Sequence, residues 1–480
     1  MANLNQFFRK NYLILIIVGI FFILYSLVSL VPHYNFRTTA WDMGIYNQTL
    51  YHYANFQIKP NTIKGISNLL GDHFELILFL LAPFYWLFHT YTLLIFQILA
   101  IISGGLGAFL FLREKTKDEI LALSGLVLFY LFFGVFIALG FCIHCNVIGI
   151  MFLPWLFYFL KKEKIKLYYV FLLLMLISRE DMALIGAILG LTVIIFEKKS
   201  LKKQGLITFI LSIIYFFSAI KFISLFNQGS YSYLSLYGTL GHAFFGGDKM
   251  KISNPFFIFS YFLNPEVKRE ALKFLLVSGG FLAIWRPQYL LLAIPMLCRN
   301  FFTDSPERWR ADYGFHYWIE IAPIISIGSI IMIYRLKGAI GYSFLKYSLI
   351  SVLIISNLFL LSQIHFFDGS KLSRIFIPIY YSGDFAQRNE IAEAIKKIPA
   401  DASLSAYNTI VPHAANRDKI YLFPEINDSQ YIILSLQNIQ LNNDREVFQK
   451  EYSKWQEIEK NKEWQKIYNQ RGVIVYKKML

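Results

Sequence analysis

Long apolar runs alternate with short polar or basic segments over most of the chain. The first run extends from Tyr12 to Val31, another begins at His316, and the others cover 92–112, 120–140, 147–160, 167–177, 182–196, 206–225, 270–285, 287–297 and 342–361. A helix needs about 20 apolar residues to cross a bilayer, and the strands of a membrane barrel would alternate polar and apolar residues, which these runs do not. The pattern predicts an all-α polytopic membrane protein with roughly eleven crossings.

Basic residues are concentrated in the short segments between these runs. They occur at Arg9-Lys10 and within 113–117, 161–166, 198–203 and 335–337. Cytoplasmic loops carry an excess of Lys and Arg, so the N-terminus is predicted to be cytoplasmic and the C-terminus extracytoplasmic. The same placement accounts for the net charge of +15, and we expect no nucleic-acid partner.

The apolar stretch 73–88 would invert all later loops if it crossed the membrane, because 113–117 would then lie outside. We therefore predict that it is re-entrant or interfacial and broken at Pro83. Broken backbone at membrane depth is tolerated where it lines a cavity, which suits a substrate cleft. The segments 32–91 and 226–269, the latter including 237–242, are predicted to be external loops.

The composition changes near residue 365, where charged residues return. Short apolar segments predict strands at 403–407, 419–423, 431–436 and 472–476, with helices at 388–398 and 444–460. We expect a transmembrane domain over 1–364 and a small soluble α/β domain over 365–480, on the extracytoplasmic side.

The first external loop opens with Trp41-Asp42-Met43-Gly44-Ile45-Tyr46, directly after the first apolar run. Asp42 has two interpretations: the N-cap of an interfacial helix, or an acid that accepts a proton from a substrate hydroxyl. Trp41 and Tyr46 are candidate substrate contacts beside it.

A second acidic group closes this loop at Asp72, His73 and Glu75. It is interpreted either as the polar start of a helix at the membrane surface or as a catalytic group. In the second case Asp72 and Glu75 would orient an acceptor sugar or coordinate a divalent ion, with His73 as a substrate contact. The sequence requires no metal or other cofactor.

Arg179, Glu180 and Asp181 follow an apolar run of only about 11 residues, which spans about 16 Å as a helix. The turn is therefore predicted to lie within the outer leaflet, where charged residues pair with one another or face a cavity. His144 and His316 lie at the outer ends of two runs and are candidate substrate ligands. Cys142 and Cys145 flank His144, and we interpret them as small buried residues.

The ordered motifs resemble those of the predicted membrane-protein family called domain of unknown function 2079, itself similar to the GT-C glycosyltransferases. The matching segments are Trp41-Asp42-Met43-Gly44-Ile45, Gly71-Asp72-His73-Phe74, Ser178-Arg179-Glu180-Asp181, Trp285-Arg286-Pro287 through Pro295 with Asn300, His316-Tyr317 before Ala322-Pro323, Pro412-His413 with Asn416-Arg417, and Tyr421-Leu422-Phe423-Pro424. Together they cover nearly the whole chain.

The resemblance implies a GT-C-like helical core in the cell (plasma) membrane. It also implies transfer of a sugar from a polyprenyl-phosphate donor to an envelope glycan or protein acceptor on the outer side. Asp42 matches the position of the general base of that class, but Met43 follows it where some members have a second acid, so Asp72 or Glu75 competes for the role.

Two other functions remain open at this point. A lipid or solute transporter would also contain charges within the membrane, although we find no repeat of broken helices in the two halves of the sequence. A non-catalytic membrane scaffold would use the external domain to bind other envelope proteins.

Overall fold

The computed structural model describes residues 2–226, 255–382, 385–440 and 444–479. The chain divides into two compact units. The larger comprises Met1–Val28, Asp72–Ile77 and Ile95–Arg374, and the smaller comprises Ser29–Gly71, Leu78–Leu94 and Ile375–Leu480. This division differs from the single boundary expected between residues 364 and 365, because most of the first external loop groups with the C-terminal residues.

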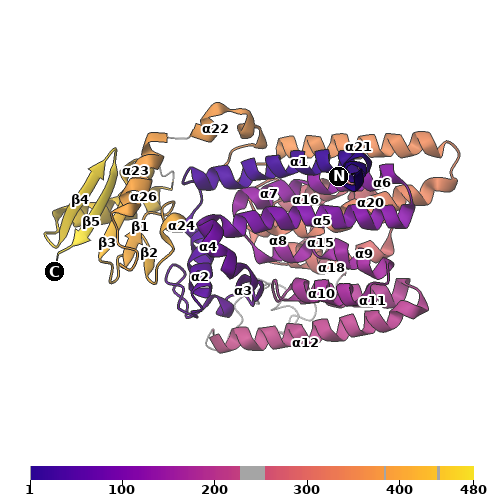
Figure 1. The fold of residues 1–480 in the computed structure, drawn as a ribbon, viewed down its shortest axis with the longest axis horizontal. Coiled ribbons are helices and arrows are strands. Elements are labelled where there is room, and N and C mark those ends of the chain that lie inside the picture. Colours follow the sequence, from indigo (N-terminus) through magenta and orange to yellow (C-terminus); the bar gives the residue numbers. More distant parts are fainter. Residues whose placement is uncertain (1, 227–254, 383–384, 441–443, 480) are drawn as a thin grey trace. The chain divides into compact units, whose positions relative to one another are not determined.

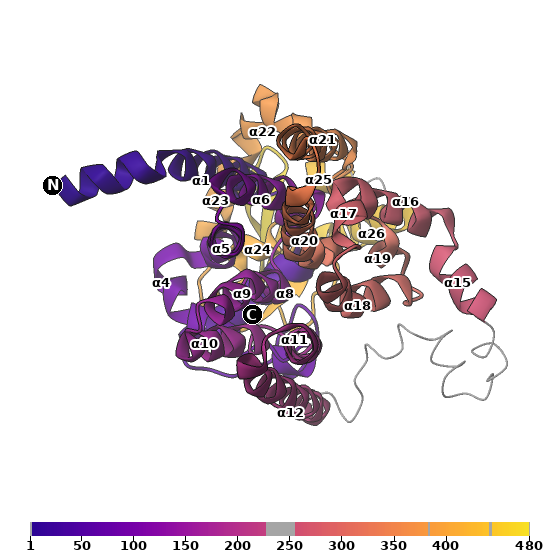
Figure 2. The same ribbon diagram turned by 90° about the vertical axis from the view of Figure 1, so that its right-hand side faces the viewer.

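The larger unit is built from helices that lie side by side, as Figures 1 and 2 show from two directions. Their bounds are α1 (Ala2–Tyr34), α5 (Thr92–Thr116), α6 (Glu119–Leu131), α7 (Phe133–Phe141), α8 (Cys145–Ile150), α9 (Leu153–Lys161), α10 (Ile165–Leu176), α11 (Met182–Phe196), α12 (Lys202–Phe226), α15 (Pro255–Leu263), α16 (Glu266–Leu275), α17 (Phe281–Ala283), α18 (Pro287–Phe301), α19 (Pro306–Trp309), α20 (Ala322–Arg335) and α21 (Tyr342–Gln363). The ends of α1 and α5 extend into the smaller unit.

Six helical stretches within the described ranges are long and apolar enough to cross a membrane. They are Asn11–Tyr34, Ile77–Thr116, Glu119–Phe141, Lys199–Phe226, His316–Gly338 and Tyr342–Gln363. Three shorter apolar stretches, Cys145–Lys161, Ile165–Leu176 and Met182–Phe196, coincide with predicted short runs. The number of crossings stays a prediction. The segment 237–242, expected in an external loop, lies outside the described residues.

The stretch that starts at Ile77 is not one straight helix. It consists of α3 (Ile77–Leu81), a 3₁₀ turn over Ala82–Phe84, α4 (Tyr85–Phe88) and a second 3₁₀ turn before α5. The break falls at Pro83, as predicted, because proline cannot donate the next backbone hydrogen bond of an α-helix. Whether the segment is re-entrant or interfacial stays a prediction.

Glycines bring α11 and α12 into close contact. A Cβ atom on Gly190 would lie 2.6 Å from the backbone nitrogen of Phe209 and 2.7 Å from the carbonyl oxygen of Gly205. Small residues allow helix backbones in a membrane to approach closely, where lipid gives no hydrophobic drive for association. The short helix α11 is therefore held against α12 along its length.

The smaller unit contains a sheet in the order β2-β1-β3-β5-β4. The strands are β1 (Leu404–Ala406), β2 (Ile420–Leu422), β3 (Tyr431–Ser435), β4 (Trp464–Gln470) and β5 (Val473–Lys478). β1 pairs in parallel with β2 and β3, whereas β5 runs antiparallel to both β3 and β4. The helices of this unit are α2 (Ile45–Ala54), α22 (Pro378–Ser382), α23 (Phe385–Lys396), α24 (Val411–Ala414), α25 (Leu436–Gln440) and α26 (Arg445–Lys460).

The first external loop completes the core of this unit. Ala40 is fully buried with the sheet residues, and Ile63 packs against the same cluster. The Thr62 hydroxyl donates to the Ile420 carbonyl over 2.6 Å and accepts from the Ile420 backbone N–H over 3.0 Å. Gln48 Nε2 donates to the Asp418 carbonyl over 3.1 Å. The loop thus caps the exposed edge of β2 and folds with residues more than 350 positions later in the sequence.

Four of the strands and both longer helices of the C-terminal region agree with the prediction. Strand β4 was missed because most of its side chains are exposed and give no alternating pattern. Its signal is the turn that follows: Arg471 and Gly472 both have positive φ, at 47° and 77°, which is typical of a two-residue hairpin turn.

Candidate functional site

The loop around Asp42 is held in a strained conformation in the smaller unit. Asp42 has φ 64° and ψ −69°, a combination that side-chain-bearing residues rarely adopt and that costs about 1–3 kcal/mol. The Ala40 N–H donates to Asn408 Oδ1 over 2.9 Å. A Cβ on Gly44 would lie 2.8 Å from Val411 Cγ1, so only glycine allows this approach. The C-terminal region therefore supports the strained loop from one side.

Asp42 precedes α2, which begins at Ile45. The backbone of Asp42 is non-helical, whereas that of Gly44 is already helical, so both interpretations of Asp42, helix cap and acid, stay predictions. The side chain of Asp42 is half-buried, Trp41 is 58% exposed, and Tyr46 is buried within α2. Strain at an acidic residue beside an exposed aromatic ring is typical of a functional loop.

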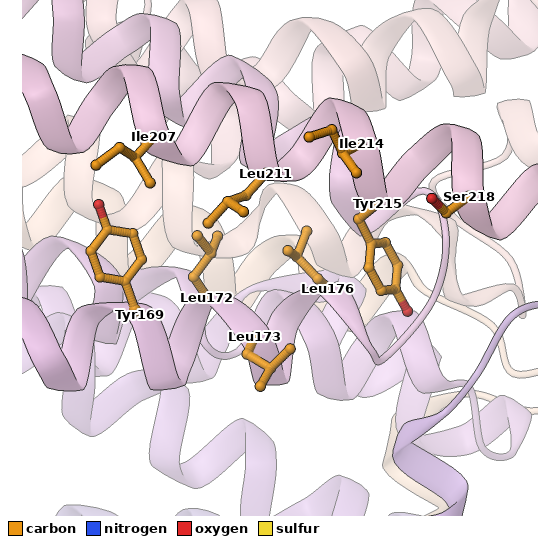
Figure 3. Close-up of a pocket in the computed structure, with 9 residues that line it drawn as sticks. All are labelled: Tyr169, Leu172, Leu173, Leu176, Ile207, Leu211, Ile214, Tyr215 and Ser218. Carbon is orange, nitrogen blue, oxygen red and sulfur yellow. The ribbon is translucent and has the colours of Figure 1, made fainter.

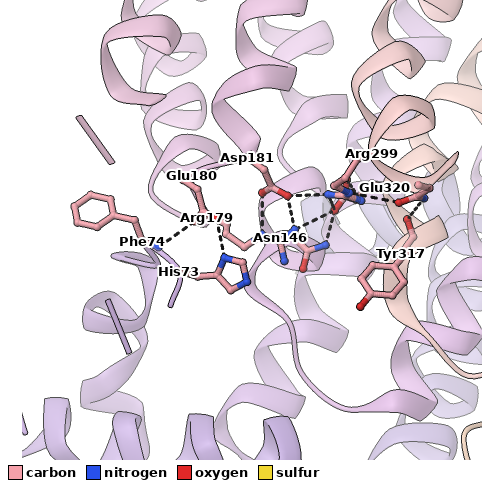
Figure 4. Close-up of polar contacts among 10 residues, drawn as sticks. His73, Phe74, Asn146, Arg179, Glu180, Asp181, Arg299, Tyr317 and Glu320 are labelled. Atoms are coloured by element: carbon pink, nitrogen blue, oxygen red, sulfur yellow. Dashed lines mark hydrogen bonds and ion pairs between the residues drawn. The ribbon is translucent and has the colours of Figure 1, made fainter. Parts of the chain in front are cut away.

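The other predicted residues lie in the larger unit, and a buried carboxylate joins two of their segments (Figure 4). Glu180 Oε1 accepts a hydrogen bond from His73 Nδ1 over 2.7 Å, and Glu180 Oε2 accepts one from the Phe74 N–H over 3.0 Å. The Glu180 side chain is 1% exposed and that of His73 is 16% exposed. A histidine whose Nδ1–H is held by a carboxylate has a fixed ring orientation and tautomer.

Asp181 belongs to a second, adjoining group of charges. Arg179 Nε donates to Asp181 Oδ1 over 2.8 Å, and Arg299 NH1 donates to Asp181 Oδ2 over 2.7 Å. Asp181 lies in the turn between α10 and α11, where both guanidinium groups form ion pairs with its carboxylate. Asp181 therefore stays charged and serves as a counter-ion.

Glu320 completes this group from the start of the predicted span at 316. It is 0% exposed, and its Oε1 accepts from Arg299 NH1 over 2.9 Å and from the Asn146 amide. Arg179 NH2 lies 3.8 Å from Glu320 Oε1. Two acids thus balance two guanidinium groups in a buried cluster, as is expected of charges that are removed from water.

The two predicted histidines stack on each other beside this cluster. The ring centroids of His144 and His316 lie 3.4 Å apart with the planes inclined by 18°, and Phe141 lies against both rings. Both histidines are buried. Neither ring nitrogen of His316 has a hydrogen-bond partner among the described residues. A buried, unpaired imidazole is costly, so a polar ligand at this position would compensate the cost.

The remaining acids occupy the same segment as His73. Glu75 is 0% exposed, whereas Asp72 is half-buried. Within the described ranges, no three His, Cys, Asp or Glu side chains are grouped so that they could hold a metal ion. Cys142 and Cys145 are buried, as predicted. The roles of Asp72 and Glu75 stay predictions.

Sequence reasoning missed three members of the buried cluster: Arg299, Asn146 and Glu320. The sequence carried a signal for Glu320, because a lone acid in an apolar run needs a cation nearby. Arg299 gave a weaker signal, since a basic residue in the last turn of a helix is common. The neutral amide of Asn146 gave none.

An apolar groove runs between α10 and α12 (Figure 3). Its volume is about 490 Å³, and it is lined by Tyr169, Leu172, Leu173, Leu176, Ile207, Leu211, Ile214, Tyr215 and Ser218. The Tyr215 ring at one end lies 6.1 Å from the ring of Phe74, whose backbone N–H binds Glu180. One end of the groove therefore lies near the segment that carries the His73–Glu180 pair.

Comparison with known proteins identifies both a sequence family and a fold. Residues 32–475 match the model of a family described as Predicted membrane protein (DUF2079). The crystal structure of ArnT from Cupriavidus metallidurans bound to undecaprenyl phosphate matches 97% of this chain and 98% of its own, with a TM-score of 0.58 and 9% identity. ArnT from the same organism in the apo state matches 99% and 98%, with a TM-score of 0.52 and 10% identity. Curated proteins give no significant sequence match.

These matches confirm the fold class predicted from the sequence. The chain is a multi-pass membrane protein with a GT-C-like helical core and a small C-terminal sheet. At about a tenth identity the structural likeness establishes the fold alone.

Proposed function

The chain belongs to the family of predicted membrane proteins DUF2079, and we propose that it is a membrane glycosyltransferase. It would transfer a sugar from a polyprenyl-phosphate donor to a glycan or protein acceptor of the cell envelope. The observation that carries the proposal is the fold shared over 97% of the chain with an ArnT structure bound to undecaprenyl phosphate. We further propose that the protein lies in the plasma membrane with its N-terminus in the cytoplasm and its C-terminal module outside.

The groove between α10 and α12 supports a lipid-borne donor. Its walls are almost entirely aliphatic and aromatic, and its volume of about 490 Å³ suits a segment of a hydrocarbon chain. The His73–Glu180 pair lies near one end, through Phe74 and Tyr215. We assign the groove to the lipid tail.

We assign the general base to Asp42. In this mechanism its carboxylate removes the proton from an acceptor hydroxyl, and the hydroxyl oxygen attacks the anomeric carbon of the donor sugar. The bond from that carbon to the phosphate oxygen breaks, and the lipid phosphate leaves with the electron pair. The configuration at the anomeric carbon is thereby inverted. The unusual backbone conformation of Asp42 supports this role, because such strained residues are concentrated at functional sites.

Two of the predicted histidines are proposed as substrate contacts. His73 is the stronger candidate, because Glu180 fixes its ring and part of the side chain stays exposed. His316 is the second, because its buried ring nitrogens lack hydrogen bonds within the described part of the chain. Arg179 is less suited to bind the donor phosphate directly, since it already pairs with Asp181 and Glu320.

The test compares lipid-linked glycans and envelope glycans by mass spectrometry in a deletion strain that expresses variants of the gene. The wild-type chain restores the missing glycan, and Asp42→Asn fails to restore it while reaching the membrane in equal amount. Asp401→Asn, the same change at an exposed site of the same unit, restores it. Full restoration by Asp42→Asn would reject Asp42 as the base. An unchanged glycan profile in the deletion strain would reject the transferase and favour a transporter or scaffold.

A further inference from the structure

A second cavity of the larger unit is surrounded by cations. Its volume is about 360 Å³, and it lies where α5, α9, α11 and α20 end and α18 begins. The cationic residues that line it are Lys115, Lys161, Lys198, Arg286 and Arg335. Four of them come from four of the basic segments that the sequence predicts to be cytoplasmic. Segments far apart along the chain thus direct their positive charge toward one cavity.

The acids in the lining do not balance these cations. Only Glu163 and Glu197 contribute negative charge among the described lining residues, against five cations. Glu163 forms an ion pair with Lys198. No acidic side chain lies within ion-pair distance of Lys115, Arg286 or Arg335 in the described ranges. The cavity therefore carries an excess of positive charge.

Among the five cations that line the cavity, Arg286 is the one whose position is least explained by the topology of membrane insertion. Lys and Arg at cytoplasmic helix ends are expected from the positive-inside bias, and helix C-termini favour cations. Arg286 instead directly precedes Pro287, at the start of α18, where the helix dipole disfavours a cation. Its Nε is buried and has no hydrogen-bond partner in the part of the chain that the structure describes.

We propose that this cavity binds a phosphate group. A phosphate oxygen would accept from Arg286 Nε, and the surrounding ammonium and guanidinium groups would neutralise the charge, as in other phosphate sites lined by Lys and Arg. The deeper walls are apolar and include Phe157, Leu189 and Leu292. The phosphate can belong to an anionic lipid of the inner leaflet or to a soluble phosphate compound. Basic cavities between membrane helices are suited to such headgroups. The proposal is independent of the transferase assignment, which concerns other residues.

Two probes separate the sources of the phosphate, both applied to the purified full-length chain. Equilibrium dialysis measures binding of inorganic pyrophosphate in detergent. Native mass spectrometry measures retention of phosphatidic acid after reconstitution in nanodiscs that otherwise contain phosphatidylcholine. The test variant is Lys115→Gln with Arg286→Gln. The control, Arg113→Gln with Lys337→Gln, removes the same charge from residues that do not line the cavity.

The expected result is binding of at least one probe that weakens about tenfold or more in the test variant, since the charge-assisted hydrogen bond from Arg286 and the positive charge of Lys115 are removed. The control should bind like the wild type. Pyrophosphate binding identifies a soluble ligand, and selective retention of phosphatidic acid identifies a lipid. The proposal is overturned if neither probe binds, or if test and control variants weaken binding equally. Thermal melting of each variant checks that the fold is intact.

Discussion

The clearest stability prediction concerns Glu320, the fully buried acid of the charge cluster. Replacing Glu320 with Gln keeps the size of the side chain but removes its charge. Arg179 and Arg299 would then face only Asp181 and carry one uncompensated positive charge in a buried site. The substitution breaks the ion pair between Arg299 NH2 and Glu320 Oε2, two atoms that lie 2.8 Å apart.

The magnitude follows from the burial of both partners. The Glu320 side chain is 0% exposed and that of Arg299 is 14% exposed, so water cannot solvate the guanidinium group that loses its partner. Removing one partner of a buried ion pair costs about 3–5 kcal/mol, because the other charge stays buried and unpaired. A matched control is Glu270→Gln, which breaks an exposed pair with Lys273 and should cost about 1 kcal/mol or less.

The assay is unfolding of the purified chain in mixed micelles of increasing denaturing detergent, followed by tryptophan fluorescence. A double-mutant cycle adds Arg299→Gln and the pair Glu320→Gln with Arg299→Gln. The double variant restores charge balance, because Arg179 and Asp181 remain paired. We expect the loss of unfolding free energy in the double variant to be smaller than the sum of the two single losses by about 2 kcal/mol or more.

Two results would refute this reasoning. A loss of stability below about 1 kcal/mol in Glu320→Gln would show that the charge of Glu320 is not needed to balance the guanidinium groups. Strict additivity in the cycle would show that Glu320 and Arg299 do not stabilise each other, whatever each contributes alone.

Three further predictions test other parts of the molecule. Burial lowers the pKa of His413 from its ordinary value of 6.5 to about 3, so below pH 6.5 this side chain takes up a proton in the unfolded chain but not in the folded chain. The free energy of unfolding of the full chain should therefore fall as the pH drops below 6.5. Unfolding measured as a function of pH should show a smaller fall in His413→Phe. Gly190→Val should lower the thermal midpoint by several degrees, because its Cβ would lie 2.6 Å from Phe209 N and separate α11 from α12. Ile214→Trp should fill the apolar groove and raise the KM for a lipid-linked donor, whereas Ile210→Trp, on the same helix but outside the groove, should leave KM unchanged.

The sequence was sufficient wherever a local pattern decides the structure. The short apolar segment 431–436 predicted a strand, and β3 lies there with all five of its residues buried. The break at Pro83 followed from the chemistry of proline alone. Arg179, Glu180 and Asp181 were recognised because charges between apolar runs need partners wherever they lie in the membrane.

The sequence could not supply the partners themselves. Glu180 pairs with His73, which is 107 positions away, and Asp181 pairs with Arg299, which is 118 positions away. In the sequence, a basic residue at the end of a helix gives the same pattern whether its side chain faces water or a buried acid. The grouping of the first external loop with the C-terminal residues has a similar cause, since Thr62 and Ile420 meet only in the folded chain.

Composition and periodicity by themselves determined that this chain spans a membrane in helices, carries a small sheet near its end, and places acids between apolar runs. These properties depend on residues close together in sequence, where hydrophobic periodicity and backbone chemistry act directly. Only the tertiary structure decided which charges balance one another, which loop completes the core of the sheet, and which basic segments surround one cavity. Those outcomes depend on contacts between side chains that are far apart in the sequence, and no local sequence pattern specifies such contacts.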